Sequence, residues 1–163
     1  MTQQEISTQR AVSALIETYR QGFLQLDPRR LGSIWDREHI PLIYVAMERP
    51  EPIQGWSAIE HYFEALPQHL EQLVEKKIDP IKVDAFGDVA AAFFEFHSIV
   101  KLKGGEGLYR PSGRVTMLFK RTRTEWRVIH YHESALAAQA ADQINRMRAT
   151  AKSRERPDRT SPA

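Results

Sequence analysis

Apolar residues recur at every third or fourth position over the first part of the chain. Over about residues 5–26 this spacing predicts a helix with one buried stripe. Asp27 and Pro28 end that helix and can begin a short second one, because Asp is a good N-cap residue and Pro fits the first helical position. The apolar run 41–46 is too short for a helix and predicts a strand, whereas helical spacing returns over about residues 55–74.

In the second half of the chain the spacing of apolar residues changes from about every fourth residue to every second residue. Residues 81–86 alternate between apolar and polar, a turn is predicted at 87–88, and a long strand is predicted over 89–103. Two further strands are predicted over about 112–121 and 126–134. Helices followed by a meander of antiparallel strands are typical of an α+β fold, here a curved sheet wrapped around a helical layer with room for a cavity between them.

The composition is that of one folded domain followed by a polar tail. With 163 residues, 42% of them hydrophobic, the chain is expected to form a single domain over residues 1–137. Residues 138–163 are expected to add a helical extension and a basic, disordered tail, because helix-forming residues come first and a charged, Pro-containing stretch follows.

Charge and missing residue types exclude several functions. The formal net charge is only +2 and no basic stripe is interleaved with aromatic residues, so no nucleic-acid partner is expected. The absence of cysteine excludes disulfides, thiolate nucleophiles and Cys-based zinc sites. Because no signal-peptide core and no run of about 20 apolar residues is present, a cytoplasmic protein without a membrane partner is expected.

The stretch WRVIHYHES near the end of the predicted sheet carries a family resemblance. Its residues follow the order Trp, His, aromatic, His, Ser, at Trp126, His130, Tyr131, His132 and Ser134. With these residues the chain resembles the nuclear transport factor 2-like superfamily, in particular SnoaL-like proteins and the association domain of calcium/calmodulin-dependent protein kinase II. The predicted third helix adds to the likeness through a second set of matching residues, Ile53, Gly55, Ile59, Tyr62 and Phe63.

The resemblance covers about residues 7–137 and implies a cone-shaped, curved antiparallel sheet around N-terminal helices, the cystatin-like roll. Functions within this fold reside in individually evolved pockets, so the resemblance identifies no reaction. It also implies that Tyr131 and Glu133 face the pocket, whereas the two histidines face the surface on which sheets of this superfamily pair as dimers.

Strict alternation along the last strand separates two faces. It places Trp126, Val128, His130, His132 and Ser134 on one face and Arg127, Ile129, Tyr131 and Glu133 on the other. No third ligand accompanies the two histidines, so no metal site is expected. The dimer interface is instead expected to contain four residues of the last two strands: Arg114, Thr116, His130 and His132.

The inward face departs from the related pockets, whose arginines suit a carboxylate ligand. At two matching positions this chain has Met117 and Glu133, which predicts a neutral or cationic ligand. Tyr19 and Tyr44 are further candidate pocket hydroxyls, although either can be a core residue. The candidate ligand-binding residues are therefore Tyr131, Tyr44, Met117 and Tyr19.

Glu95 and His97 share one face of the long strand and are candidate catalytic residues together with Glu133. If the three converge, a carboxylate beside a histidine can act as a general base that removes a proton next to a carbonyl. In the alternative, Glu95 and His97 face solvent and Glu133 pairs with an arginine.

Three functions remain open on these residues. The first is binding of an unidentified small molecule by a homodimer or larger oligomer. The second is a cofactor-independent isomerase, cyclase or dehydratase that uses Glu95, His97 or Glu133 as base and Tyr131 as hydrogen-bond donor. The third is an assembly module in which the cavity is secondary. No cofactor is expected for any of them, because no phosphate-binding loop or dinucleotide motif is present.

Overall fold

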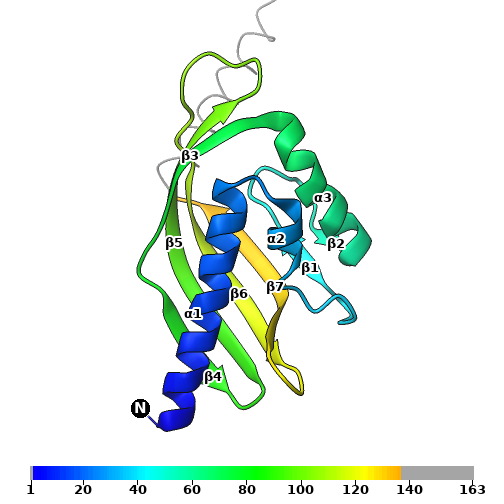
Figure 1. Ribbon diagram of the computed structural model, residues 1–163, viewed down its shortest axis with the longest axis vertical. Helices are drawn as coiled ribbons and strands as arrows, with labels where there is room; N and C mark the ends of the chain where they lie inside the picture. Colours follow the sequence, from blue (N-terminus) through cyan, green and yellow to red (C-terminus); the bar gives the residue numbers. More distant parts are fainter. Residues whose placement is uncertain (1, 137–163) are drawn as a thin grey trace, which may run out of the picture.

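The computed structural model describes residues 2–136 and contains the predicted helices and strands in order, with two further strands that were not predicted (Figure 1). The elements are α1 (Gln3–Leu24), α2 (Pro28–Gly32), β1 (Ile43–Val45), β2 (Ile53–Gln54), α3 (Trp56–His69), β3 (Leu70–Ile78), β4 (Lys82–Phe86), β5 (Val89–Leu102), β6 (Ser112–Arg121) and β7 (Trp126–Ala135). The helical extension and basic tail expected over 138–163 lie outside the described residues. Within the described part, no helix is long and apolar enough to cross a membrane.

Side-chain caps begin the first two helices, and the sequence predicted the cap of the second. Thr2 and Glu5 form a capping box at α1, each side chain accepting the other's backbone N–H. Asp27 caps α2 by accepting the N–H groups of Arg29 and Arg30, with Pro28 at the first helical position. The caps satisfy backbone donors that have no partner inside a helix, and they fix where each helix begins.

The third helix ends earlier than its sequence suggests. Helical spacing predicted a helix to about residue 74, whereas α3 ends at His69 and residues 70–78 form β3, so this prediction was wrong. The segment pairs with β5 in antiparallel register, interrupted by two bulges. Because these bulges break the strict alternation of a strand, the residues of β3 do not show period two in the sequence.

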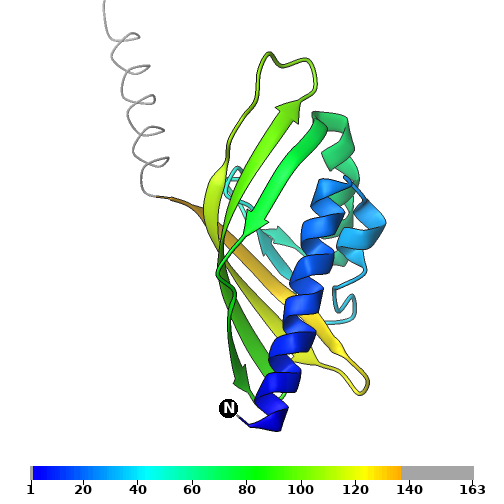
Figure 2. The same ribbon diagram turned by 60° about the vertical axis from the view of Figure 1, so that its left-hand side comes forward.

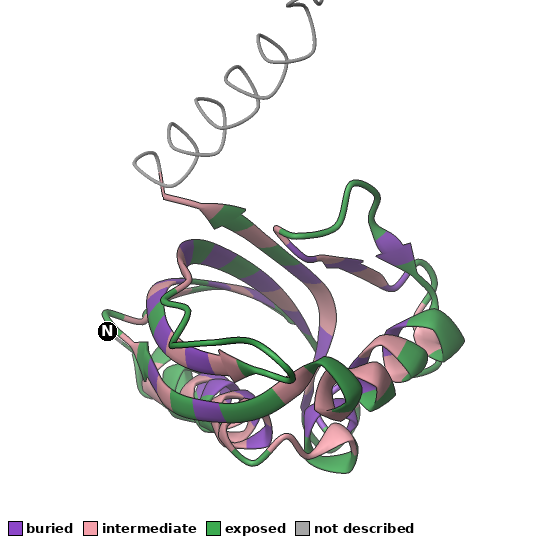
Figure 3. Cartoon of the chain, turned by 90° about the horizontal axis from the view of Figure 1, so that it is seen from above, coloured by how far each residue is buried: buried purple, intermediate pink, exposed green. Residues whose placement is uncertain are grey.

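One sheet contains all the strands, in the order β2-β1-β7-β6-β5-β3, and β4 also pairs with β5. β1 lies parallel to β7, which departs from the fully antiparallel sheet that was expected. The sheet curves around α1, and the helices lie on its concave side (Figure 2). Along β5 and β6 buried residues alternate with more exposed ones, so the inner face forms the core and the outer face is open (Figure 3).

A bulge in β7 changes which residues face the core. Leu118 of β6 pairs with His130, but the next residue, Phe119, pairs with Val128, so Ile129 is an extra residue. Strict alternation placed Trp126 and Val128 on the outer face, and this was wrong, because both are buried, at 7% and 0% exposure. One inserted residue reverses the alternation beyond it, which leaves the histidines outside and Tyr131 inside.

Candidate functional site

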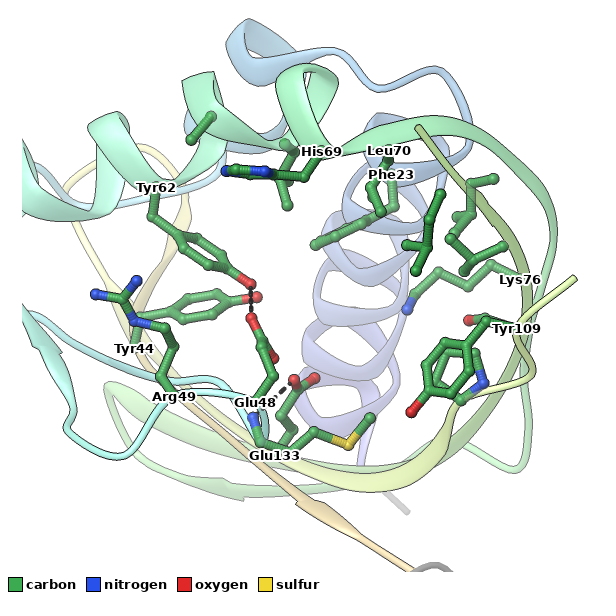
Figure 4. Close-up of a pocket in the computed structure, with 18 of the residues that line it drawn as sticks. Phe23, Tyr44, Glu48, Arg49, Tyr62, His69, Leu70, Lys76, Tyr109 and Glu133 are labelled. Carbon is green, nitrogen blue, oxygen red and sulfur yellow. Dashed lines mark hydrogen bonds between the residues drawn. The ribbon is translucent and has the colours of Figure 1, made fainter. Parts of the chain in front are cut away.

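A cavity of about 780 Å³ lies between the concave face of the sheet and helix α3 (Figure 4). This volume is within the range of small-molecule pockets. Most of its wall is apolar, contributed by residues such as Phe23, Ile53, Leu66, Leu73, Phe96 and Val100. A smaller set of polar side chains also lines it, including Glu48, His61, Tyr62, His69, Lys76, Ser98 and Glu133.

Glu133 is held in the cavity wall by two elements of the fold. Its Oε2 accepts the hydroxyl of Tyr131 at 2.6 Å, and its Oε1 accepts the backbone N–H of Met47 at 3.0 Å. Burial raises the pKa of this carboxyl above its ordinary value, and the negative charge of Glu48 adds to the effect. The two hydrogen bonds and the positive charge of Lys76 act in the opposite direction. The result is an oriented carboxyl group that takes up a proton more readily than an exposed glutamate.

Lys76 is the buried amine of the cavity. It lies opposite Ser98 on the inner face of β3, and the residue is 6% exposed. Its Nζ lies 4.3 Å from the ring centre of Phe96 and 4.9 Å from that of Phe23. Burial lowers the pKa of Lys76 to about 8, and the attraction of Glu133 opposes part of this change. A basic group in apolar surroundings thus faces the interior of the cavity (Figure 4).

Stacked tyrosines support the acidic side of the cavity. Tyr44 and Tyr131 stack with ring centres 4.4 Å apart, and the hydroxyls of Tyr44 and Tyr19 share a hydrogen bond of 2.9 Å. Tyr62 of α3 donates a hydrogen bond of 2.7 Å to Glu48 (Figure 4). Burial raises the pKa of each of these tyrosines well above the ordinary value, so the phenols stay neutral. Such a hydrogen-bonded, packed cluster fixes the position of the groups beside it.

Ser98 supplies a polar atom without a partner in the protein. Its Oγ is buried and forms no hydrogen bond within residues 2–136, although the residue lines the cavity. Buried hydroxyls normally have a hydrogen-bond partner, so Ser98 can still bond a ligand or a water molecule.

The family of the chain follows from its sequence as well as its shape. The model of the SnoaL-like domain matches residues 12–138. The chain belongs to the SnoaL-like domain family. No curated protein is significantly similar to it in sequence.

Solved structures share the fold of this SnoaL-like chain at low sequence identity. A nuclear transport factor 2-like superfamily protein from Salmonella enterica is 20% identical, with a TM-score of 0.72 over 82% of this chain and 94% of that one. A Xanthomonas campestris protein classed with the calcium/calmodulin-dependent protein kinase II association domain is 19% identical, with a TM-score of 0.64 over 78% and 87%. A hexachlorocyclohexane dehydrochlorinase is 13% identical, with a TM-score of 0.70 over 80% and 86%. These likenesses confirm the predicted fold, a curved sheet around N-terminal helices.

The SnoaL-like cavity contains some of the residues expected there. Glu133 and Tyr44 line it. Tyr131 and Tyr19 lie one layer behind, in the hydrogen-bonded cluster, and Met117 is fully buried on the inner face of β6 without reaching the cavity wall.

Glu95 and His97 do not converge with Glu133 in the cavity wall, so the structure has the alternative in which these two residues face outward. On β5 the inner face is formed by Phe94, Phe96 and Ser98, so the residues between them point outward. His97 is exposed, and its Nδ1 lies 3.0 Å from Oγ of Ser112 at the outer surface.

The outer face of the SnoaL-like sheet carries the four residues expected at a dimer interface. Thr116 pairs with His132 in register, and Arg114 and His130 lie on the same face. Burial lowers the pKa of His130, and the neighbouring His132 adds to the effect. Within residues 2–136, no group of three or more acidic, histidine or cysteine side chains is placed to hold a metal ion. The interface itself stays a prediction.

Lys76, Glu48, Tyr62 and Ser98 are site residues that the sequence did not reveal. Lys76 falls just after a segment predicted as helix, and Glu48 is in the loop after β1, where no periodicity applies. Ser98 could have been found, because it alternates with Phe94 and Phe96 along the predicted long strand.

Proposed function

We propose that the cavity of this SnoaL-like protein binds a neutral, largely apolar small molecule that carries a polar group such as a carbonyl or hydroxyl. The observation that carries the proposal is an apolar cavity with Glu133, Lys76 and the unpartnered hydroxyl of Ser98 in its walls. Apolar walls supply the affinity, and a few polar groups fix the orientation of a ligand. The opposite charges of Glu133 and Lys76 favour a neutral ligand over a simple organic acid.

A fluorescent neutral ketone, 6-propionyl-2-dimethylaminonaphthalene, tests this proposal. Leu73 lines the cavity at 6% exposure, whereas its neighbour Val74 is 46% exposed and is not part of the cavity wall. Leu73→Trp fills the cavity and is expected to weaken binding at least tenfold, and Val74→Trp is the matched control with unchanged binding. Equal binding by both variants, each shown to be folded by circular dichroism, contradicts the cavity as the site.

The second candidate function is catalysis without a cofactor, with Glu133 as the general base. The raised pKa of Glu133 favours it, because a base works best when its pKa approaches the working pH. Proton abstraction next to a carbonyl is the expected chemistry, with Tyr131 holding the carboxyl in position through its hydrogen bond. The similarity in fold to a dehydrochlorinase supports an elimination as well. Loss of turnover with retained ligand binding in Glu133→Gln is the expected sign of this role.

We also propose that a second copy of the chain covers the outer face of the sheet. This face exposes several large apolar side chains, Phe86 at 66%, Phe93 at 38% and Val89 at 38%. It also carries Glu95 opposite Arg114 in register, so its charges are of both signs and two copies related by a two-fold axis can pair them. The similarity in fold to a protein classed as an association domain supports self-association.

A further inference from the structure

We propose that Lys76 forms a covalent imine with the carbonyl group of an aldehyde or ketone bound in the cavity. This inference rests on the proposed binding function and extends it by naming a reactive residue and a ligand class.

The position of Lys76 is that of a nucleophilic amine. The residue is 6% exposed and lines the cavity, so a reagent reaches Nζ through the space in which a ligand is bound. Phe23 and Phe96 pack against Nζ, and within residues 2–136 it takes part in no ion pair or hydrogen bond. Removing an amine from water and from fixed acidic partners is a common way in which proteins activate lysine as a nucleophile.

The free amine is also available near neutral pH. With a pKa of about 8, about a quarter of Lys76 is unprotonated at pH 7.5, against roughly one part in a thousand for a lysine with the ordinary pKa. The charged groups that act on it are few. Glu133 faces it from β7 and raises its pKa, and Arg20 of α1 donates a hydrogen bond to its backbone oxygen.

The reaction balances with the groups present in the cavity. The lone pair of Nζ forms a bond to the carbonyl carbon, and the carbonyl oxygen takes up a proton to become a hydroxyl. The nitrogen loses one proton, the hydroxyl leaves as water after receiving another proton, and the nitrogen lone pair forms the C=N bond. Loss of the remaining N–H proton then gives the neutral imine. Amine and carbonyl therefore give imine and water. Glu133 lines the same cavity with a raised pKa, so its carboxyl can donate and recover the proton.

The chain contains its own control for this chemistry. Lys77 is the next residue along β3, but its side chain is 70% exposed and pairs with Glu75. A reagent that modifies lysines by exposure alone will favour Lys77, whereas a reagent bound in the cavity will favour Lys76. The two rates can be compared within one molecule, which makes the comparison independent of the fold of any variant.

The experiment traps the imine with sodium cyanoborohydride at pH 7.5, using 6-methoxy-2-naphthaldehyde as the probe. Peptide mapping by mass spectrometry is expected to show Lys76 modified at least tenfold faster than Lys77. Lys76→Arg is expected to remove the rapid modification and Lys77→Arg to leave it unchanged. The alcohol 6-methoxy-2-naphthalenemethanol, which cannot form an imine, is expected to slow modification of Lys76 by occupying the cavity.

Two results would overturn the inference in distinguishable ways. Suppose that the alcohol binds and that Leu73→Trp weakens its binding, but that Lys76 reacts no faster than Lys77. The imine proposal then fails and the binding function stands. If neither the alcohol nor the neutral ketone binds and Lys76 is not preferentially modified, both proposals fail.

Discussion

The hydroxyl of Tyr131 donates a hydrogen bond of 2.6 Å to Oε2 of Glu133, two residues further along β7. Both side chains lie on the inner side of the strand because residues two apart share a face. Met47, in the loop after β1, donates its backbone N–H to the other carboxyl oxygen. Two separate elements therefore fix one carboxyl group, and its burial raises its pKa.

The first prediction concerns Glu133→Gln. Because the pKa of Glu133 is higher in the folded chain than its ordinary value, ionising it costs more in the folded state. The contribution of Glu133 to stability is complete below the ordinary glutamate pKa of about 4.3. It is lost as the pH rises through the higher pKa that Glu133 has in the folded chain. The variant is therefore expected to have a higher free energy of unfolding than the parent chain at pH 7 and to differ little from it at pH 4.

Urea titrations at the two pH values measure this difference. Glu95→Gln on the outer face is the matched control, and it is expected to leave stability within about 0.5 kcal/mol of the parent chain. A destabilised Glu133→Gln at pH 7 would mean that the hydrogen bonds from Tyr131 and Met47 outweigh the cost of burying the charge.

The second prediction concerns the stability of Lys76→Met. The pKa of Lys76 falls from 10.5 to about 8 on folding, so the protonated amine destabilises the folded chain. The contribution of Lys76 to stability is complete above its ordinary pKa of 10.5. It is lost as the pH falls through the pKa of about 8 that Lys76 has in the folded chain. Lys76→Met is expected to raise the free energy of unfolding by about 1–3 kcal/mol at pH 7, and by much less at pH 10. Lys77→Met, the exposed neighbour, should show no such gain in denaturant titrations.

The third prediction concerns a close contact in the sheet. A Cβ added at Gly113 of β6 would lie 2.7 Å from the backbone oxygen of Ser134 and 2.8 Å from Cε1 of Phe96. Gly113→Ala must therefore push strands apart, and we expect a loss of about 1–3 kcal/mol in thermal or chemical unfolding. Gly105→Ala, whose nearest contact would be 3.4 Å, is expected to be neutral. Equal stability of the two variants would contradict the packing of β6 against Phe96.

Local sequence signals predict local structure well in this chain. The cap at Asp27 acts within three residues, so the sequence alone indicates where α2 begins. The long strand β5 is also evident, and in the structure its burial alternates without interruption from Val89 to Lys101. The closing motif of β7 adds the family and hence the order of the elements.

Features set by strand pairing could not be predicted in the same way. The bulge at Ile129 exists because of the register between β6 and β7, and no residue type marks it. It reverses the face assigned to Trp126 and Val128. The strand β3 is likewise defined by its pairing with β5, which is why Lys76 was missed as a site residue. The family motif, rather than counting from Trp126, assigned Glu133 and Tyr131 to the inner face, where Glu133 lines the cavity and Tyr131 lies behind it.

The last prediction concerns the proposed dimer, whose interface is the outer face of the sheet. Phe93→Lys replaces an exposed apolar side chain of this face by a charge and is expected to give a monomer in sedimentation equilibrium at pH 7.5. Leu108→Lys is the control, because Leu108 is 51% exposed but lies in the loop between β5 and β6. A monomeric parent chain, or a dimer that tolerates Phe93→Lys, would place the interface elsewhere or remove it.

Acid should weaken the same dimer. His130 lies on this face beside His132, with Thr116 and Arg114 on the adjoining strand, and burial already lowers its pKa in the single chain. Cover by a second copy would lower the pKa of His130 further, so a proton binds the monomer better than the dimer. The dissociation constant is therefore expected to rise below the ordinary histidine pKa of about 6.5, by at most about tenfold per pH unit for each proton taken up. His130→Ala should remove part of this dependence. A dimer whose affinity does not change between pH 7.5 and pH 5 would show that the histidines lie outside the interface or pair there with carboxylates.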